Sequence, residues 1–171
     1  VHTDRGGPYT DWPMSAVQSG MDAGLPHLGA QVSVSGSLIE NLDALESSGW
    51  SFGGWKNRWQ ESTGWTTSEG NPRVYLTAFG YHHPLMALID EQALVLQVEM
   101  HRVAVQRAFG APPGRGMFPP ENAFSPRMIP ALLDAGIEWI LVDSIHFERA
   151  HLDYPWNNGS NLVPPNGADI W

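Results

Sequence analysis

Short apolar runs alternate along this chain with longer stretches in which apolar residues recur every three or four positions. Four runs have the length and composition of β-strands: residues 30–34, 74–79, 117–118 and 137–142. Helical periodicity follows each of the first three runs, and no helix is apparent after the fourth. Strands that alternate with helices are typical of a parallel sheet covered by helices. The sequence therefore predicts an α/β fold built from parallel βα units.

The longest predicted helix spans residues 90–109. Asp90 is a capping residue type, and Gly110 suits the left-handed position that commonly ends a helix. Its buried stripe is expected to consist of Leu94, Val98, Val105 and Phe109. Glu99 and His101 lie on the same helix, away from any strand end, and we expect them to be exposed or structural.

Three shorter helices are predicted over residues 13–23, 38–47 and 125–135. A glycine follows each of them closely, and glycine readily adopts the backbone conformation that stops a helix. At the start of the third, Ser125 can cap and Pro126 suits the first helical position. These end signals make the helix boundaries the best-defined part of the pattern.

Residues 49–72 follow neither the helical nor the strand period. The segment is rich in Trp and Gly and is too long for a routine connection, so we predict a functional loop or lid. Indole rings can stack on the apolar faces of sugars, which makes Trp55 a candidate sugar-binding residue. The alternative is that these tryptophans simply cover one end of the fold.

Composition narrows the possible partners. The chain has 171 residues with 42% hydrophobic and 16% charged residues, which is enough for one globular domain. Its formal net charge of -9 disfavours nucleic acid and anionic membrane surfaces as partners, and neutral sugars are not repelled. Without cysteine it has neither disulfides nor thiolate metal sites. No secretory signal is apparent, but the chain begins at Val1 rather than Met, so its compartment stays open.

Polar or reactive side chains follow every predicted strand. They are Ser35, His82 and His83, Glu121, and Asp143 with His146. The carboxyl ends of parallel strands meet at one rim, so we expect these groups to share a site. Glu121 is the first candidate for chemistry, because it stands where a strand gives way to a helix. The alternative is an acid that caps a turn or pairs with Arg115 or Arg127.

Several chemistries fit this set of side chains. Two carboxylates, several histidines and many tryptophans fit glycoside hydrolysis, in which a pair of acids flanks the bond. They also fit a metal-dependent polysaccharide deacetylase, in which His and Asp hold a divalent cation. A third alternative is a non-catalytic carbohydrate-binding remnant. Neither a phosphate-binding Gly-rich loop nor a nucleophile-elbow Ser motif is present.

Several segments resemble glycoside hydrolase family 57 in order and spacing, over roughly residues 28–155. Residues 116–126 resemble the nucleophile motif of that family, with Glu121 at the position of the catalytic Glu. Val142, Asp143, His146 and Phe147 match a Val-Asp-x-x-His-Phe pattern at the end of the next strand. Gly80, Tyr81 and Pro84 match an earlier segment, and Ser35-Gly36-Ser37-Leu38 matches an early turn.

The resemblance implies an incomplete (β/α)7 TIM-like barrel, with residues 1–171 forming a single, partial catalytic domain. It implies retaining hydrolysis or transfer of α-glucans without a cofactor or metal, with Glu121 as the nucleophile. The expected substrate-binding residues are His82, His83, Asp143, His146, Trp55, Phe118 and Tyr81.

The chain also departs from the family pattern. The opening His-Gln-Pro motif is absent, Phe118 replaces the usual Trp before the Glu, and a Glu of the earlier segment is missing. The acid/base Asp of the family belongs to a later motif, beyond Trp171. Four strands are too few to close a barrel, so we expect the remainder of the barrel, or a second copy in a homo-oligomer, to complete it.

Overall fold

The structure is a computed structural model that describes residues 6–143. Its strands are β1 (Ala30–Val32), β2 (Val74–Leu76), β3 (Gly116–Met117) and β4 (Trp139–Ile140). Its α-helices are α1 (Gly7–Thr10), α2 (Trp12–Asp22), α3 (Gly36–Ser47), α4 (Asn57–Ser62), α5 (Glu91–Phe109) and α6 (Ile129–Asp134). Short 3-10 turns cover Met86–Leu88, Pro120–Asn122 and Pro126–Met128. No helix within residues 6–143 is long and apolar enough to cross a membrane.

The four strands run parallel and lie in chain order. The paired residues are Ala30 with Val74, Val32 with Leu76, Gly116 with Trp139 and Met117 with Ile140. A parallel bridge between Ala78 and Met117 connects the β1–β2 pair to the β3–β4 pair. The predicted α/β class with parallel βα units is therefore confirmed. The strands predicted at 30–34, 74–79 and 137–142 are too long, because pairing ends at Val32 in the first and at Leu76 in the second, and covers only Trp139–Ile140 in the last.

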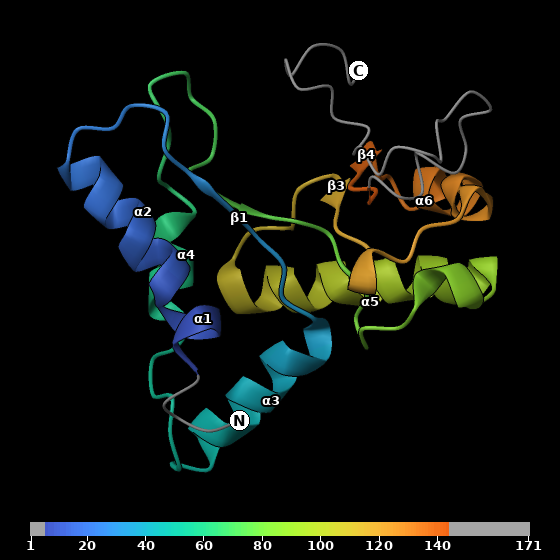
Figure 1. Ribbon diagram of the computed structural model, residues 1–171. Coiled ribbons are helices and arrows are strands. Elements are labelled where there is room, and N and C mark those ends of the chain that lie inside the picture. Colours follow the sequence, from blue (N-terminus) through green and yellow to red (C-terminus); the bar gives the residue numbers. More distant parts are fainter. Residues whose placement is uncertain (1–5, 144–171) are drawn as a thin grey trace, which may run out of the picture.

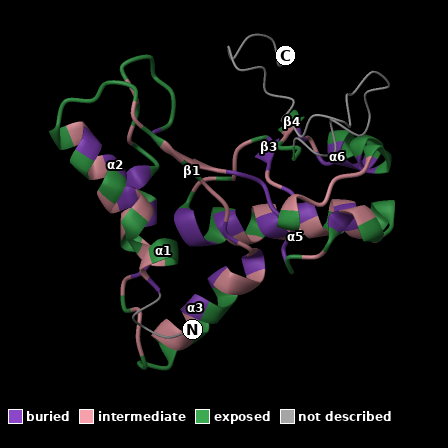
Figure 2. Cartoon of the chain, in the orientation of Figure 1, coloured by how far each residue is buried: buried purple, intermediate pink, exposed green. Residues whose placement is uncertain are grey.

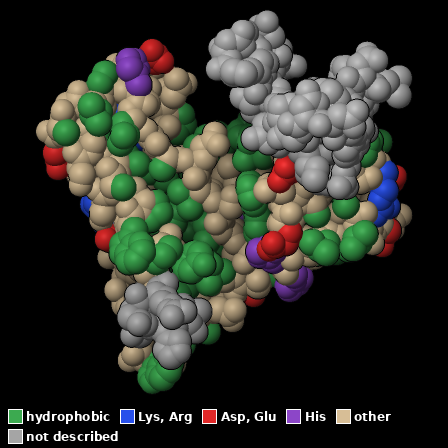
Figure 3. All heavy atoms as spheres, viewed as in Figure 1, with side chains coloured by type: hydrophobic (Ala, Val, Ile, Leu, Met, Phe, Trp, Pro, Cys, Tyr) green, Lys and Arg blue, Asp and Glu red, His purple; other side chains and the backbone are tan. Residues whose placement is uncertain are grey.

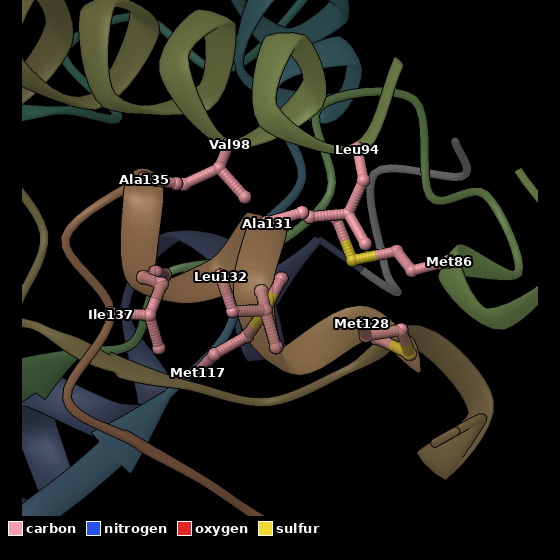
Figure 4. Close-up of a cluster of buried hydrophobic side chains, with 10 residues drawn as sticks. Met86, Leu94, Val98, Met117, Met128, Ala131, Leu132, Ala135 and Ile137 are labelled. Carbon is pink, nitrogen blue, oxygen red and sulfur yellow. The ribbon is translucent and has the colours of Figure 1, made fainter. Parts of the chain in front are cut away.

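The helices cover one face of these strands. Helix α5 runs beneath the strands with α3 and α6 beside it, and α2 and α4 lie together at one side (Figure 1). Buried residues concentrate where α5 meets the strands (Figure 2). In one core cluster Leu94 and Val98 of α5 point toward Ala131 of α6 and Ala135 just after it, and Met117 of β3 lies beneath them (Figure 4). Burial of such side chains contributes about 1.5–3 kcal/mol each for the larger ones.

The ends of α5 are as predicted. The Asp90 carboxylate accepts a hydrogen bond from the Ala93 backbone N–H at 2.8 Å, and Gly110 ends the helix at φ 82°. Helix α3 begins two residues earlier than predicted, at Gly36, because the Ser35 hydroxyl accepts the Leu38 N–H at 3.2 Å. These caps satisfy backbone donors that would otherwise be unpaired at the helix start.

The Trp-rich segment 49–72 is partly regular and partly core. Residues 57–62 form α4, so the prediction of an irregular loop is wrong for these six residues. The Trp59 ring lies 5.2 Å from the Phe109 ring, and Trp55 meets Phe109 edge-on at 5.7 Å. The segment connects the end of α3 to the start of β2. It therefore lies at the amino-terminal end of the strands, opposite the rim where βα loops gather.

The strand face away from the helices carries a second set of contacts. The Tyr75 ring stacks on Trp139 at 5.8 Å, and the Ser33 and Thr77 hydroxyls lie 2.7 Å apart. Gly116 allows the aromatic pair to sit this close, because a Cβ there would lie 1.8 Å from the Trp139 ring. Its N–H also donates to the Tyr75 hydroxyl at 3.0 Å.

Candidate functional site

Two of the predicted site residues meet at the carboxyl ends of the strands. His83 follows β2, Glu121 follows β3, and His83 Nε2 lies 3.2 Å from Glu121 Oε1. Both side chains are open to solvent, with 47% and 71% of their surface exposed. Histidine and acidic side chains adjoin at two places on the face shown in Figure 3, and a second exposed pair is His27 with Glu69. The sequence predicted only that both side chains reach one rim; their direct contact is an observation of the structure.

The backbone of this pair is unusual. His83 has φ 59° and Glu121 has φ 56°, the left-handed region that side-chain-bearing residues rarely adopt. Asn122 continues the conformation at φ 52°. Such residues cost about 1–3 kcal/mol each and cluster at functional sites, where the surrounding structure holds them. Two of these three residues, His83 and Glu121, also contact each other through their side chains.

A proline turn presents Glu121. The chain leaves β3 through Pro119 and Pro120, and the Asn122 N–H donates to the Pro119 carbonyl at 2.9 Å. The Ala123 N–H donates to the Pro120 carbonyl at 3.0 Å. Prolines fix φ and limit the paths that the chain can take. The turn therefore projects the carboxylate outward to His83. Of the arginines weighed from the sequence as its partners, Arg115 pairs with Glu138, and Arg127 donates to backbone carbonyls.

Aromatic rings flank the pair. The Phe118 ring stacks on Phe79 at 6.2 Å, and Phe79 meets the His83 ring edge-on at 5.0 Å. Sequence reasoning did not single out Phe79 as a site residue. The signal was its position: it ends the predicted strand 74–79 and alternates with Tyr75 and Thr77 on the face away from the helices.

His82 and Tyr81 are placed differently. The His82 side chain is exposed, and its backbone N–H donates to Gln97 Oε1 at 2.8 Å. Tyr81 is buried, with its ring packed over Gly36, where a Cβ would lie 2.1 Å away. A hydrogen bond to the Glu40 carboxylate, together with burial and the nearby negative charge, raises the pKa of Tyr81. Tyr81 therefore joins the rim to α3 instead of facing solvent.

The remaining predicted residues are not all brought to this rim. Asp143 is exposed and lies just past β4, on the carboxyl side. Trp55 is buried at the other end of the strands, and its indole N–H donates to Asp43 at 3.1 Å. The structure separates Trp55 from the rim because it belongs to an αβ connection. His146 lies outside the described residues.

A buried histidine lies behind the rim. His101 is fully buried on α5, its Nε2 is 2.8 Å from the Val34 carbonyl, and its Nδ1 accepts the Phe79 N–H at 3.3 Å. Burial lowers the pKa of His101 to about 4, so the ring is neutral at pH 7. Of the two expectations for this residue, the structural one is correct. Its expected position away from any strand end is wrong, because α5 packs the ring between Val34 and Phe79, where the first two predicted strands end. Its neighbours on the buried stripe, at positions 94, 98 and 105, were the signal for its burial.

No group of three or more His, Asp or Glu side chains in the described part of the chain is arranged to hold a metal ion. The deacetylase alternative needs such a group, because a catalytic cation takes about three protein ligands. Residues 6–143 therefore contain no set of ligands for the cation that a metal-dependent deacetylase needs.

Known families and proteins show clear similarity to this chain. The family model described as glycosyl hydrolase family 57 matches residues 16–162. An alpha-amylase of Niallia circulans is 28% identical over 182 aligned residues, covering 99% of this chain and 14% of that protein. A 4-alpha-glucanotransferase of Thermococcus litoralis is 29% identical over 81 residues, covering 47% of this chain and 12% of that protein. The chain thus spans less than a fifth of the length of these curated relatives.

Two solved structures resemble the fold. The crystal structure of the Thermococcus litoralis 4-alpha-glucanotransferase matches with a TM-score of 0.60 at 20% identity, over 79% of this chain and 18% of that one. A CE4 family pseudoenzyme from Bacillus anthracis matches with a TM-score of 0.50 at 14% identity, over 81% of this chain and 43% of that one. At these identities the two likenesses support the fold alone.

Proposed function

This chain belongs to glycosyl hydrolase family 57, and from that premise we propose that the protein containing it hydrolyses or transfers α-glucans with retention of configuration. Relatives called alpha-amylase and 4-alpha-glucanotransferase support the substrate class. The observation that carries the proposal is the Glu121 carboxylate at the strand rim, 3.2 Å from His83 and held in a strained turn.

In this proposal Glu121 is the nucleophile. Its carboxylate oxygen attacks the anomeric carbon, and the bond to the leaving oxygen breaks as a separate acid gives that oxygen a proton. The resulting glycosyl-enzyme ester is then attacked by water in hydrolysis, or by a sugar hydroxyl in transfer. The acid/base residue comes from outside residues 6–143. His83 fixes the orientation of the carboxylate through the hydrogen bond between them.

The sugar is held by the groups around this carboxylate. We propose that His82, Asp143 and His146 contact its hydroxyls, and that the half-buried Phe118 ring packs on a ring face. Trp55 and Tyr81 are not in this proposed set, because both are buried and pack against helices.

We further propose that these four strands are the first part of a TIM-like barrel. Within residues 6–143, β1 pairs only with β2 and β4 only with β3, so each outer strand keeps one side open for another strand. Trp139, Leu141 and Val142 on the β4 side are partly exposed. Exposed apolar residues on an unpaired edge favour burial by further polypeptide.

Substitution of Glu121 tests the function. In the full-length polypeptide, Glu121→Gln should lower kcat on starch-type substrates by roughly 10⁴-fold or more, because the amide cannot form the ester. Substrate binding should survive the change. Glu138→Gln is the matched control, since Glu138 is an exposed glutamate at the opposite end of β4, paired with Arg115. It should keep normal turnover.

Rescue with azide distinguishes a nucleophile from a merely structural glutamate. Glu121→Gly removes the carboxylate and leaves room for a small anion, which can form the bond to the anomeric carbon itself. The expected product is a glycosyl azide of inverted configuration. Undiminished turnover in Glu121→Gln would disprove the nucleophile assignment. Glucan binding without any turnover in the unaltered full-length protein would favour a carbohydrate-binding remnant.

A further inference from the structure

We infer that His101 is a positioning residue that wedges β1 and β2 apart at the rim and, through Phe79, holds His83 in reach of Glu121. The catalytic consequence of this inference rests on the proposed function. The geometric part does not, because it concerns only how the strand ends are held.

The wedge is visible in the hydrogen-bond register. Val32 pairs with Leu76, and the Thr77 N–H donates to the Val32 carbonyl at 3.0 Å. Two residues further along a parallel ladder, the same register would join the Phe79 N–H to the Val34 carbonyl. Those two groups instead bond to opposite nitrogens of one imidazole, at 3.3 and 2.8 Å. The ring of His101 therefore occupies the place of a direct ladder bond.

The two bonds require one particular form of the ring. Val34 offers a carbonyl, so Nε2 must carry a proton to donate. Phe79 offers an N–H, so Nδ1 must present a lone pair to accept it. Only the neutral Nε2–H tautomer does both, and the burial of His101 favours a neutral ring. Burial of His101 therefore favours the same neutral ring that the hydrogen bonds to Val34 and Phe79 require.

Two contacts connect Phe79 to the candidate nucleophile Glu121. Phe79, displaced from direct pairing with β1, packs edge-on against His83 at 5.0 Å and stacks on Phe118 at 6.2 Å. His83 in turn lies 3.2 Å from Glu121. Removal of the wedge lets the strand ends approach or leaves both backbone groups without partners. Either change shifts the backbone of Phe79, and the Phe79 ring that packs against His83 moves with it.

The test uses the full-length polypeptide and two substitutions of His101. His101→Leu keeps apolar volume and removes both hydrogen bonds. His101→Gln can still accept from one backbone group and donate to the other through its side-chain amide. We expect His101→Leu to lower kcat on starch-type substrates by about 10–100-fold with KM changed less than about 3-fold, since small misplacements have effects of this size. His101→Gln should restore kcat to within about 3-fold.

A matched control separates positioning from lost stability. Val105→Ala truncates a buried residue on the same stripe of α5, one turn further from the rim, and should lower the melting temperature without lowering kcat. Normal kcat in folded His101→Leu, an equal kcat loss in Val105→Ala, or no recovery in His101→Gln would each overturn the inference. If His101→Leu does not fold, Phe79→Leu replaces it as the test. This variant keeps the hydrogen bond from the backbone N–H of residue 79 to His101 and removes the aromatic ring that packs against His83. Normal kcat in Phe79→Leu would overturn the inference.

Crystal structures of the variants measure the His83–Glu121 geometry independently of catalytic activity. In His101→Leu the His83–Glu121 distance should lengthen beyond about 3.5 Å, the limit of a hydrogen bond, and in His101→Gln it should not. An unmoved Phe79 and an intact His83–Glu121 bond in His101→Leu would refute the wedge. Failure of the Glu121→Gln test would instead refute the proposed function and leave this geometric result standing.

Discussion

Acidification should loosen the junction of β1, β2 and α5, because His101 is buried there as a neutral ring. Burial lowers the pKa of His101 to about 4 from an ordinary value of 6.5. Between these two values an unfolded chain binds a proton at this residue and the folded protein does not. Stability is therefore unaffected by His101 above pH 6.5 and falls progressively as the pH drops toward 4. At about 1.4 kcal/mol for each pKa unit, the complete loss is roughly 3.5 kcal/mol.

Hydrogen exchange measures this loss locally. The Phe79 N–H is bonded to the ring, so peptides containing Phe79 report the free energy of opening at the junction. Exchange is followed by mass spectrometry between pH 7 and pH 4.5, and rates are corrected for the intrinsic pH dependence of amide exchange. The opening free energy should fall with pH most steeply below about pH 6.

His101→Gln provides the comparison that isolates one residue. Carboxylates elsewhere titrate in both proteins, but glutamine does not bind a proton in this range. The difference between the two proteins should therefore grow by about 1.4 kcal/mol per pH unit as the pH falls from 6 to 4.5. Parallel pH dependences would show that His101 is solvated or already charged, and would refute the reasoning.

Two further substitutions test the packing of the strands. Gly116→Ala should lower the free energy of unfolding by about 1–3 kcal/mol, measured by urea titration, because the new Cβ would meet the Trp139 ring at 1.8 Å. Gly53→Ala is its control: a Cβ there meets nothing within 4 Å, so a similar loss in both would contradict the steric argument. Arg73 is buried and donates to four backbone carbonyls, so Arg73→Leu should cost about 3–5 kcal/mol, as for other buried charged networks. Arg73→Lys should recover part of it, and a loss below about 1 kcal/mol in Arg73→Leu would show that water reaches those carbonyls.

Local signals in the sequence were enough to predict most of the architecture. Asp90 and Gly110 bound the longest helix as expected, since a cap depends on residues within one turn. The apolar run at 74–79 predicted a strand, and Glu121 was expected at the carboxyl end of the next predicted strand, 117–118. The α/β fold class was predicted from the order of strands and helices and from the family motifs.

The Trp-rich segment shows where local pattern is insufficient. Aromatic content alone does not distinguish a sugar platform from a core, and Trp55 was predicted to bind substrate. Its location depends on which end of the strands receives an αβ connection, a property of the chain path through space. The contact of Trp55 with Phe109 reflects that path.

The sequence by itself determined that this chain forms parallel βα units and that an acid follows the third strand. It also determined, to within one residue, where α2, α3, α5 and α6 end. These properties come from periodicity and from capping, which act between residues a few positions apart. Only the tertiary structure decided that His83 meets Glu121, 38 positions away, and that His101 lies between Val34 and Phe79, 67 and 22 positions away. Such pairs form because packing of α5 against the strands brings distant residues together, and no local preference encodes that distance.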